Sequence, residues 1–229
     1  MARKGKTDST GYRRKKKTPE LPPVLRIIGG RMRGRKLIYG GDRRTRPMKD
    51  RVREAVFNLL GPGIKGKIAI DLFAGTGALG LEAISRGAIG ALLIEQHYPT
   101  AEVIRQNITG VGIDQPCEVI SADTFIWARR DPSLPESPWV VFCSPPYDFY
   151  VEREADMLGL VAYLLDHAPV GSLFAVEADE RFDFSKLPQP ERWDVRCYPP
   201  ATVGVLSIQE DATDDPKEEN IEGSGDGCA

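Results

Sequence analysis

The sequence has few of the residues that build metal centres and disulfide frameworks. Its 229 residues include only four cysteines and two histidines, and no Cys-x-x-Cys pair occurs. This spacing predicts neither a zinc site nor a disulfide framework, so we expect no metal. There is no run of about 18 apolar residues to span a membrane, and the basic N-terminus lacks the apolar core of a secretory signal. These absences favour a cytoplasmic globular protein, which we expect to be a monomer.

Positive charge is concentrated at one end of the chain. The formal net charge of -2 combines +14 over residues 1–60, -9 over 61–209 and -7 over 210–229. A basic N-terminal segment joined to an acidic remainder favours a polyanionic partner. A solvated tail that binds nothing specific would have the same composition. Residues 1–23 and 210–229 lack an apolar period, and we expect both tails to be disordered.

Between the tails, residues 24–60 predict a small N-terminal extension. Two short apolar segments, Val24–Ile28 and Lys36–Tyr39, are separated by a Gly/Arg-rich stretch and predict a hairpin. A helical pattern follows, with Pro47 suited to its first turn and Gly61 at its end.

Residues 61–209 alternate between strand and helix patterns. The expected strands are Ile68–Phe73, Ala91–Glu95, Glu118–Ser121, Trp139–Cys143, Ser172–Glu177, Trp193–Tyr198 and Thr202–Gln209. The expected helices are Ala78–Arg86, Pro99–Thr109, Thr124–Arg130 and Glu152–His167. Such alternation predicts a Rossmann-like, mostly parallel α/β sheet with helices on both faces. The last two strands, joined by a short turn, would place one antiparallel strand at or near the edge.

A glycine-rich loop joins the first strand to the first helix of this domain. Gly75, Gly77 and Gly80 fit the G-x-G-x-x-G pattern, and Glu95 ends the next strand. In a doubly wound sheet this arrangement places a tight turn and a ribose-binding carboxylate at one crevice. The pattern predicts an adenosine-type cofactor, but by itself it does not choose between NAD and S-adenosylmethionine.

Two aspartates favour S-adenosylmethionine. Asp71, just before the loop, would disfavour a pyrophosphate and suit a cationic ligand. Asp123 follows the third strand and could accept from the adenine amino group, or it could serve only as a helix cap. We expect the cofactor to contact the residues around these strand ends: Asp71, Phe73, Gly75, Thr76, Gly77, Glu95, Gln96, Asp123 and Thr124.

The buried strand Trp139–Cys143 is followed by Ser144-Pro145-Pro146-Tyr147, a turn stiffened by two prolines. An exocyclic amino nitrogen is a poor nucleophile because its lone pair is delocalised into the base. Ser144 Oγ and the Pro145 carbonyl could accept its two hydrogens and localise the lone pair, while Tyr147 stacks on the base. We therefore expect Ser144, Pro145, Pro146 and Tyr147 to be catalytic; a rigid loop without chemistry is the alternative.

Several motifs together resemble the RsmD family of 16S rRNA guanine 2-amino methyltransferases. They are Arg26-Ile27-Ile28-Gly29-Gly30, Gly34-Arg35-Lys36-Leu37, Thr45-Arg46-Pro47, Asp50-Arg51-Val52-Arg53-Glu54, Phe57-Asn58, Asp71–Glu82, Ser85-Arg86-Gly87-Ala88 and Ile94-Glu95. The resemblance covers about residues 25–209. It implies a class I methyltransferase that uses S-adenosylmethionine to methylate ribosomal RNA of the small subunit or its assembly intermediate.

Ser144 departs from this family, whose motif begins with Asp or Asn. A hydroxyl is uncharged, so its hydrogen bond to the target amine should be weaker. Ser-Pro-Pro-Tyr is also similar to the motif of DNA cytosine 4-amino methyltransferases. Two alternatives therefore stay open: an RNA-binding or ribosome-assembly protein with weakened catalysis, and an amino methyltransferase that acts on DNA or another RNA.

The basic residues of the extension are candidates for contact with RNA phosphates. They are Arg26, Arg31, Arg33, Arg35, Lys36, Arg46 and Arg51. Phosphate contacts would make binding dependent on salt, and the target guanine must leave its stack to reach Tyr147. The alternative is a solvated charged face.

Overall fold

The structure is a computed structural model that describes residues 25–39 and 47–210. The predicted basic tail, Arg46 and all but the first residue of the predicted acidic tail lie outside the described residues. None of the helices in residues 25–39 and 47–210 is long and apolar enough to cross a membrane.

The strands form a single seven-stranded sheet within the described residues, in the order β3-β2-β1-β4-β5-β7-β6. Their bounds are β1 Ile68–Asp71, β2 Gly90–Ile94, β3 Cys117–Ile120, β4 Trp139–Cys143, β5 Leu173–Asp179, β6 Asp194–Tyr198 and β7 Ala201–Ser207. β1 to β5 pair in parallel, and β7 is antiparallel to both β5 and β6. The predicted fold class is confirmed, and the strand order reverses between β1 and β4, where ligands bind in such sheets.

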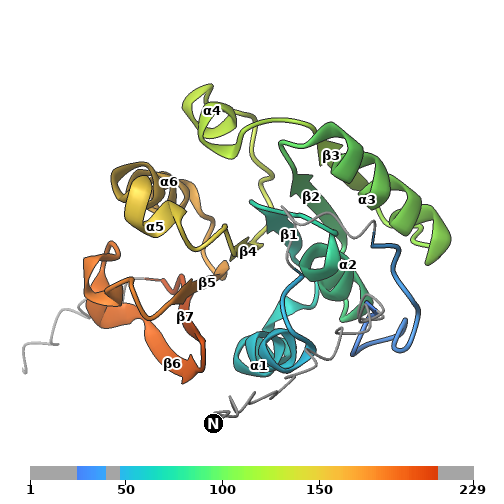
Figure 1. Ribbon diagram of the computed structural model, residues 1–229, viewed down its shortest axis with the longest axis horizontal. Coiled ribbons are helices and arrows are strands. Elements are labelled where there is room, and N and C mark those ends of the chain that lie inside the picture. Colours follow the sequence, from blue (N-terminus) through green and yellow to red (C-terminus); the bar gives the residue numbers. More distant parts are fainter. Residues whose placement is uncertain (1–24, 40–46, 211–229) are drawn as a thin grey trace, which may run out of the picture.

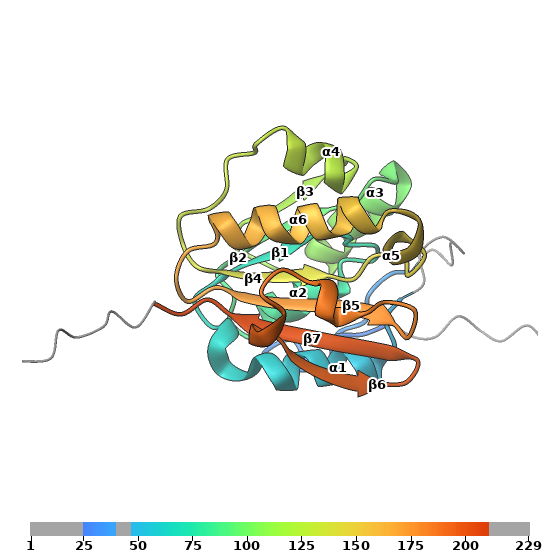
Figure 2. The same cartoon turned by 90° about the vertical axis from the view of Figure 1, so that its left-hand side faces the viewer.

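Helices cover both faces of the sheet (Figures 1 and 2). On one face lie α1 Asp50–Leu60, α2 Ala78–Ser85 and α3 Tyr98–Gly110; on the other lie α4 Thr124–Arg129, α5 Phe149–Glu152 and α6 Glu154–His167. Alternate strand residues enter the two cores, as Val140 and Val141 of β4 illustrate. Short 3-10 turns occupy Gly61–Ile64, Phe184–Lys186 and Pro190–Arg192.

The expected N-terminal hairpin is present: Ile27 donates to the Arg35 carbonyl at 3.0 Å, Leu37 donates to the Leu25 carbonyl at 2.9 Å, and Arg26 and Lys36 form an antiparallel bridge. Two helix starts differ in detail from the prediction. Pro47 precedes the helix, which begins at Asp50 after an extended Lys49. The helix expected over Glu152–His167 is α6, which begins two residues later at Glu154; Glu152 ends the short α5, and Arg153 (φ -132°) separates the two helices.

The N-terminal segment is attached to α2 by buried polar groups. Glu82 accepts from the Ile28 amide at 2.9 Å, and the Ser85 hydroxyl accepts from the Met32 amide at 2.9 Å. Gly30 lies so close that a Cβ would fall 2.0 Å from the Ser85 carbonyl oxygen, and its φ of +72° also favours glycine. The segment shares one apolar core with α1 and α2.

Candidate active site

A cavity of about 480 Å³ opens at the carboxyl ends of the parallel strands. Its size is that of an ordinary small-molecule site. One side is formed by the ends of β1, β2 and β3, and the other by the turn after β4 and the end of β5. The expected cofactor residues that line it are Phe73, Gly75, Thr76, Glu95, Gln96, Asp123 and Thr124, and all four residues of Ser144–Tyr147 line it too.

The glycine loop has the conformation that its sequence requires. Gly77 has φ +78°, a value that disfavours other residues. A Cβ on Gly80 would lie 2.9 Å from Leu93 Cδ2, so this glycine allows α2 to approach β2. Glu95 accepts from the Gly75 amide at 2.9 Å and from the His97 amide at 2.8 Å. These two bonds hold the Glu95 carboxylate at the cavity wall beside the glycine loop.

Asp71 lies buried beneath the glycine loop and does not line the cavity. The sequence predicts direct contact of Asp71 with the cofactor, and this prediction differs from the observed position. Asp71 Oδ2 accepts from the Gly80 amide at 3.1 Å, and its buried Oδ1 has no hydrogen-bond partner among the described residues. Burial raises the pKa of Asp71 to about 7, and the charge of Glu95 adds to the rise. An uncompensated carboxylate beside the loop fits a cofactor that carries positive charge.

Asp123 caps α4, as the alternative interpretation predicted, and it also lines the cavity. Its Oδ1 caps α4 by accepting from the amides of Phe125 at 2.9 Å and Ile126 at 3.0 Å. Its Oδ2 lies 3.6 Å from a guanidinium nitrogen of Arg153. The cap and the cavity position are compatible, because the two oxygens face different groups.

An aromatic wall beside Asp123 escaped the sequence analysis. The rings of Phe73, Phe125 and Phe149 lie 5.8–6.0 Å apart, and the Arg153 guanidinium carbon lies 3.9 Å from the Phe125 ring centroid. All three phenylalanines line the cavity. They come from the end of β1, α4 and α5, so no local pattern brings them together; their rings are tilted by 44–77° to one another and form an apolar part of the cavity wall.

Glu177, at the end of β5, was also missed. The Ser144 hydroxyl donates to its Oε2, and the Tyr147 hydroxyl donates to its Oε1 at 2.7 Å. Only 6% of Glu177 is exposed, and burial raises the pKa of its carboxyl, while the two hydroxyl bonds oppose the rise. The sequence did offer a signal for Glu177. It is a carboxylate at the end of a predicted parallel strand, like Glu95 at the end of the strand predicted over Ala91–Glu95.

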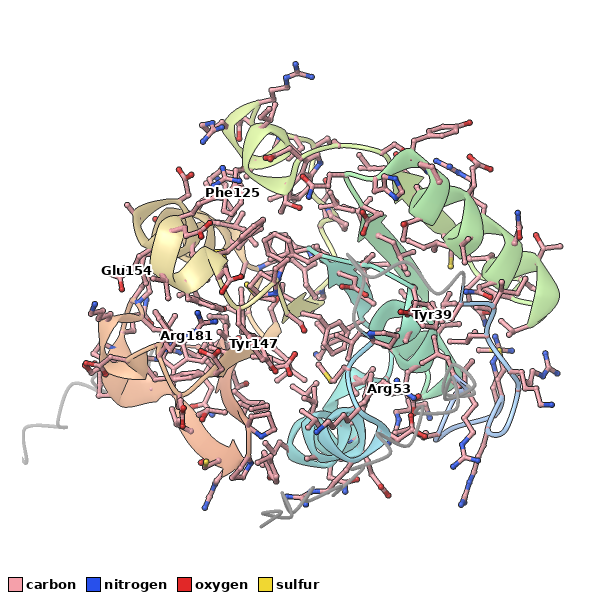
Figure 3. All side chains as sticks on the ribbon, viewed as in Figure 1. Tyr39, Arg53, Phe125, Tyr147, Glu154 and Arg181 are labelled. Carbon is pink, nitrogen blue, oxygen red and sulfur yellow. The ribbon has the colours of Figure 1, made fainter. Side chains whose placement is uncertain are left out.

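Two positively charged side chains line the cavity, one before α1 and one after β5. Lys49 and Arg181 line the cavity, and Arg181 pairs with Asp148 at 2.9 Å and Asp179 at 2.8 Å. Arg181, Tyr147 and Phe125 all line the cavity, and Figure 3 shows the labels of Arg181 and Tyr147 close together in this view, with Phe125 farther away.

The candidate RNA-binding residues of the extension lie farther from the cavity. Arg31, Arg33, Arg35 and Lys36 are exposed. Their turn packs on Ser85, the last residue of α2, whereas the first residues of α2 line the cavity. Arg31 and Arg35 also donate to Gln115 and to the Val111 carbonyl. Arg26 lies 3.6 Å from Asp50, and Arg51 is exposed.

Comparisons with known proteins bear on this site. The family model described as "Conserved hypothetical protein 95" matches residues 25–187. Ribosomal RNA small subunit methyltransferase D of Haemophilus influenzae is 34% identical over 199 residues, which are 86% of this chain and 97% of that protein. The chain belongs to the RsmD family.

Two further relatives agree with this membership. The protein of the same name from Escherichia coli (strain K12) is 41% identical over 124 residues, but the match covers 54% of this chain and only 60% of the relative. The solved structure titled "Putative methyltransferase yhhF from Escherichia coli" superposes with a TM-score of 0.68 at 28% identity, covering 81% of this chain and 98% of that one. The resemblance predicted from the motifs is therefore confirmed, and this RsmD family member has the class I methyltransferase fold.

Proposed function

We propose that this chain uses S-adenosylmethionine to methylate the exocyclic 2-amino group of a guanine in 16S rRNA of the small ribosomal subunit. The observation that carries the proposal is a single cavity lined by both the glycine loop and the Ser144–Tyr147 turn. One side suits an adenosine and the other suits a flat base bearing an amino group. Membership of the RsmD family supports ribosomal RNA as the substrate.

The residues of the cofactor side fit S-adenosylmethionine. Glu95 would bind the ribose, Asp123 and the phenylalanine wall the adenine, and buried Asp71 would attract the positive groups. When bound, the cofactor would supply an electrophilic sulfonium methyl, and the base nitrogen that receives it would release one proton to water.

The residues of the turn act on the target base. Ser144 Oγ and the Pro145 carbonyl accept the two amino hydrogens, which localises the nitrogen lone pair. Tyr147 stacks on the base and holds the nitrogen in line for transfer. Catalysis is then mainly positioning and electrostatics, and the two prolines keep the acceptors in place.

The test is methyl transfer from labelled donor to small-subunit particles that lack the modification, followed by nucleoside analysis. We expect 2-methylguanine. Its absence, with donor binding measured by calorimetry, would exclude the proposal. Parallel reactions on free rRNA and duplex DNA distinguish a ribosomal substrate from the DNA alternative that Ser144 suggests.

Tyr147→Ala should lower kcat/KM roughly 10- to 100-fold, because base stacking contributes about 1–3 kcal/mol. Tyr147→Phe keeps the ring and should lose less. Single-turnover rates on the particle would measure both. Equal losses in the two variants would contradict stacking and point to the hydroxyl alone.

The exposed cations of the extension should set the salt dependence of RNA binding. Replacing Arg33 and Lys36 with alanine should weaken binding and lower the slope of log K against log salt by about 0.7–0.9 for each phosphate that the variant no longer neutralises. Filter binding of rRNA across a salt series measures this slope. Lys65→Ala is the matched control, because Lys65 is exposed beside β1 at the edge remote from the cavity. An unchanged slope in the double variant would favour a solvated face.

A further inference from the structure

Glu177 is a buried carboxylate within the proposed active site that the reaction described above does not use. Both side-chain oxygens bond to the turn after β4: Oε2 accepts from the Ser144 hydroxyl and Oε1 accepts from the Tyr147 hydroxyl at 2.7 Å. Burying a carboxylate costs free energy unless it is hydrogen-bonded. Here the bonds that offset this cost come from the two side chains that would handle the target base.

The direction of the Ser144 bond decides what this residue offers to a substrate. A serine hydroxyl has one hydrogen and two lone pairs. Since Ser144 donates its hydrogen to Glu177, its lone pairs are the groups left to face the cavity, and they can accept from an amino group. A hydroxyl without Glu177 would be able to turn its hydrogen toward the substrate instead.

We propose that Glu177 is a positioning residue for amino-group methylation, which orients and polarises the Ser144 hydroxyl so that Ser144 Oγ accepts from the target amine. The inference rests on the proposed function. A hydroxyl that donates to a carboxylate becomes a stronger acceptor, because hydrogen bonds in a chain polarise one another. In motifs that begin with Asp, the carboxylate at the position of Ser144 carries the negative charge. Here Glu177, on the neighbouring strand β5, carries it and acts on the amine through Ser144.

Glu177 also holds the second half of the base site. The Tyr147 hydroxyl donates to its other oxygen, which limits rotation and translation of the ring on which the base would stack. The Glu177 carboxylate thus fixes the position of the Ser144 hydroxyl relative to the Tyr147 ring.

The central test is Glu177→Gln, which keeps the shape and removes the charge. The amide can donate to Ser144 and reverse the bond between them. At saturating donor, kcat on small-subunit particles should fall roughly 10- to 100-fold, the effect expected for a charge-assisted hydrogen bond. The donor Kd should stay unchanged, because Glu177 contacts the base side of the cavity, and the loss should appear mainly in kcat and only slightly in the particle KM. Glu177→Asp keeps the charge and should recover part of the rate.

Glu180→Gln is the matched control, since Glu180 is exposed in the turn after β5 and does not line the cavity. It should behave as the unsubstituted protein. A second comparison uses Ser144→Ala: adding Glu177→Gln to this variant should cost much less than Glu177→Gln alone, because Glu177 acts mainly through Ser144. An unchanged donor Kd shows that each variant is folded.

The pH profile supplies another readout. Besides Ser144 and Tyr147, the titratable groups on the Glu177 side are Tyr150, which interacts with the Glu177 charge, and Cys143, which bonds to Tyr150; Lys49 and Arg181 line the same cavity. Burial raises the pKa of Cys143 to about 12 and also raises that of Tyr150, so both stay neutral near pH 7. Since burial raises the pKa of Glu177, kcat should fall as pH drops through that raised value. Glu177→Gln should lose this acid limb; saturating donor keeps Asp71 from contributing through donor affinity.

The outcomes separate the two proposals. Guanine methylation by the unsubstituted protein, with no loss of kcat in Glu177→Gln, would overturn the role of Glu177 and leave the proposed function intact. Additive effects of Ser144→Ala and Glu177→Gln would also overturn it. Failure of the unsubstituted protein to methylate any base would overturn both.

Discussion

Replacing Glu82 with alanine should lower the free energy of unfolding by about 3–5 kcal/mol, the range found when one partner of a buried ion pair is removed. Glu82 is fully buried in α2. It accepts from Arg86 at 3.0 and 3.1 Å and from the Ile28 amide at 2.9 Å. The guanidinium of Arg53, also fully buried, lies 3.6 Å away. The substitution would remove the buried carboxylate that faces the Arg53 Nε, leaving Arg53 only its bonds to Asp50 and backbone carbonyls, and it would leave the Ile28 amide without its acceptor.

The loss of Glu82 should also destabilise the contacts of α2 with α1 and the N-terminal segment, because Arg53 connects them. It donates to the Arg26 carbonyl at 2.7 Å and to Asp50 at 2.9 Å, so Glu82 lies at the junction of α1, α2 and the N-terminal segment (Figure 3 labels Arg53 there). Urea unfolding of Glu82→Ala measures the loss. Glu54→Ala, an exposed change on α1, should stay within about 0.5 kcal/mol of the unsubstituted protein.

A double variant distinguishes a stranded charge from a simple packing defect. Arg53→Met combined with Glu82→Leu should be more stable than Glu82→Leu alone, since it removes the cation together with its partner. If the double variant is the less stable of the two, the network stabilises the fold by itself and our interpretation of Arg53 is wrong.

The elements that repeat a local pattern were the ones that the sequence predicted well. Trp139–Cys143 is a continuous apolar run and is the strand β4 with the predicted bounds. The glycine loop was predictable because the positive φ of Gly77 and the close approach at Gly80 each demand glycine. The Ser144–Tyr147 turn was predictable because two prolines must end a strand.

Features that depend on distant residues were not predictable. Glu177 is 33 residues from Ser144, and only the pairing of β4 with β5 brings their side chains together. Arg153 separates α5 from α6, and its guanidinium lies over the Phe125 ring and 3.6 Å from Asp123, contacts with residues distant in the sequence. Asp71 was predicted at the right strand end, but its position beneath the loop follows from the packing of α2 on β1.

The second large effect is expected at Asp71, whose replacement by asparagine should stabilise the protein and weaken donor binding. Burial raises its pKa from 3.8 to about 7 in the folded state. A raised pKa means that the folded protein binds the proton more tightly, so its stability is greatest below the unfolded value and is lost as pH rises toward 7. At pH 8 the ionised group costs the fold up to about 4 kcal/mol, from 1.36 kcal/mol per pKa unit.

Asp71→Asn removes this cost, because the amide oxygen can still accept from the Gly80 amide without burying a charge. The gain in unfolding free energy should be largest at about pH 8, smaller at about pH 5.5, and near zero below about pH 4, as measured by urea unfolding at each pH. A gain that does not depend on pH would contradict an origin in ionisation.

Donor binding should change in the opposite direction. An ionised Asp71 attracts the positive charges of S-adenosylmethionine, so the asparagine variant should bind it about tenfold more weakly or worse at pH 8. Adenosine, which carries neither positive group, is the matched ligand and should bind both proteins equally in calorimetry. For the same reason, the unsubstituted protein should lose affinity for the donor as pH falls below about 7, and the variant should not. Stabilisation without loss of affinity would mean that the buried charge does not serve the cofactor, because the attraction that we assign to it would then be absent.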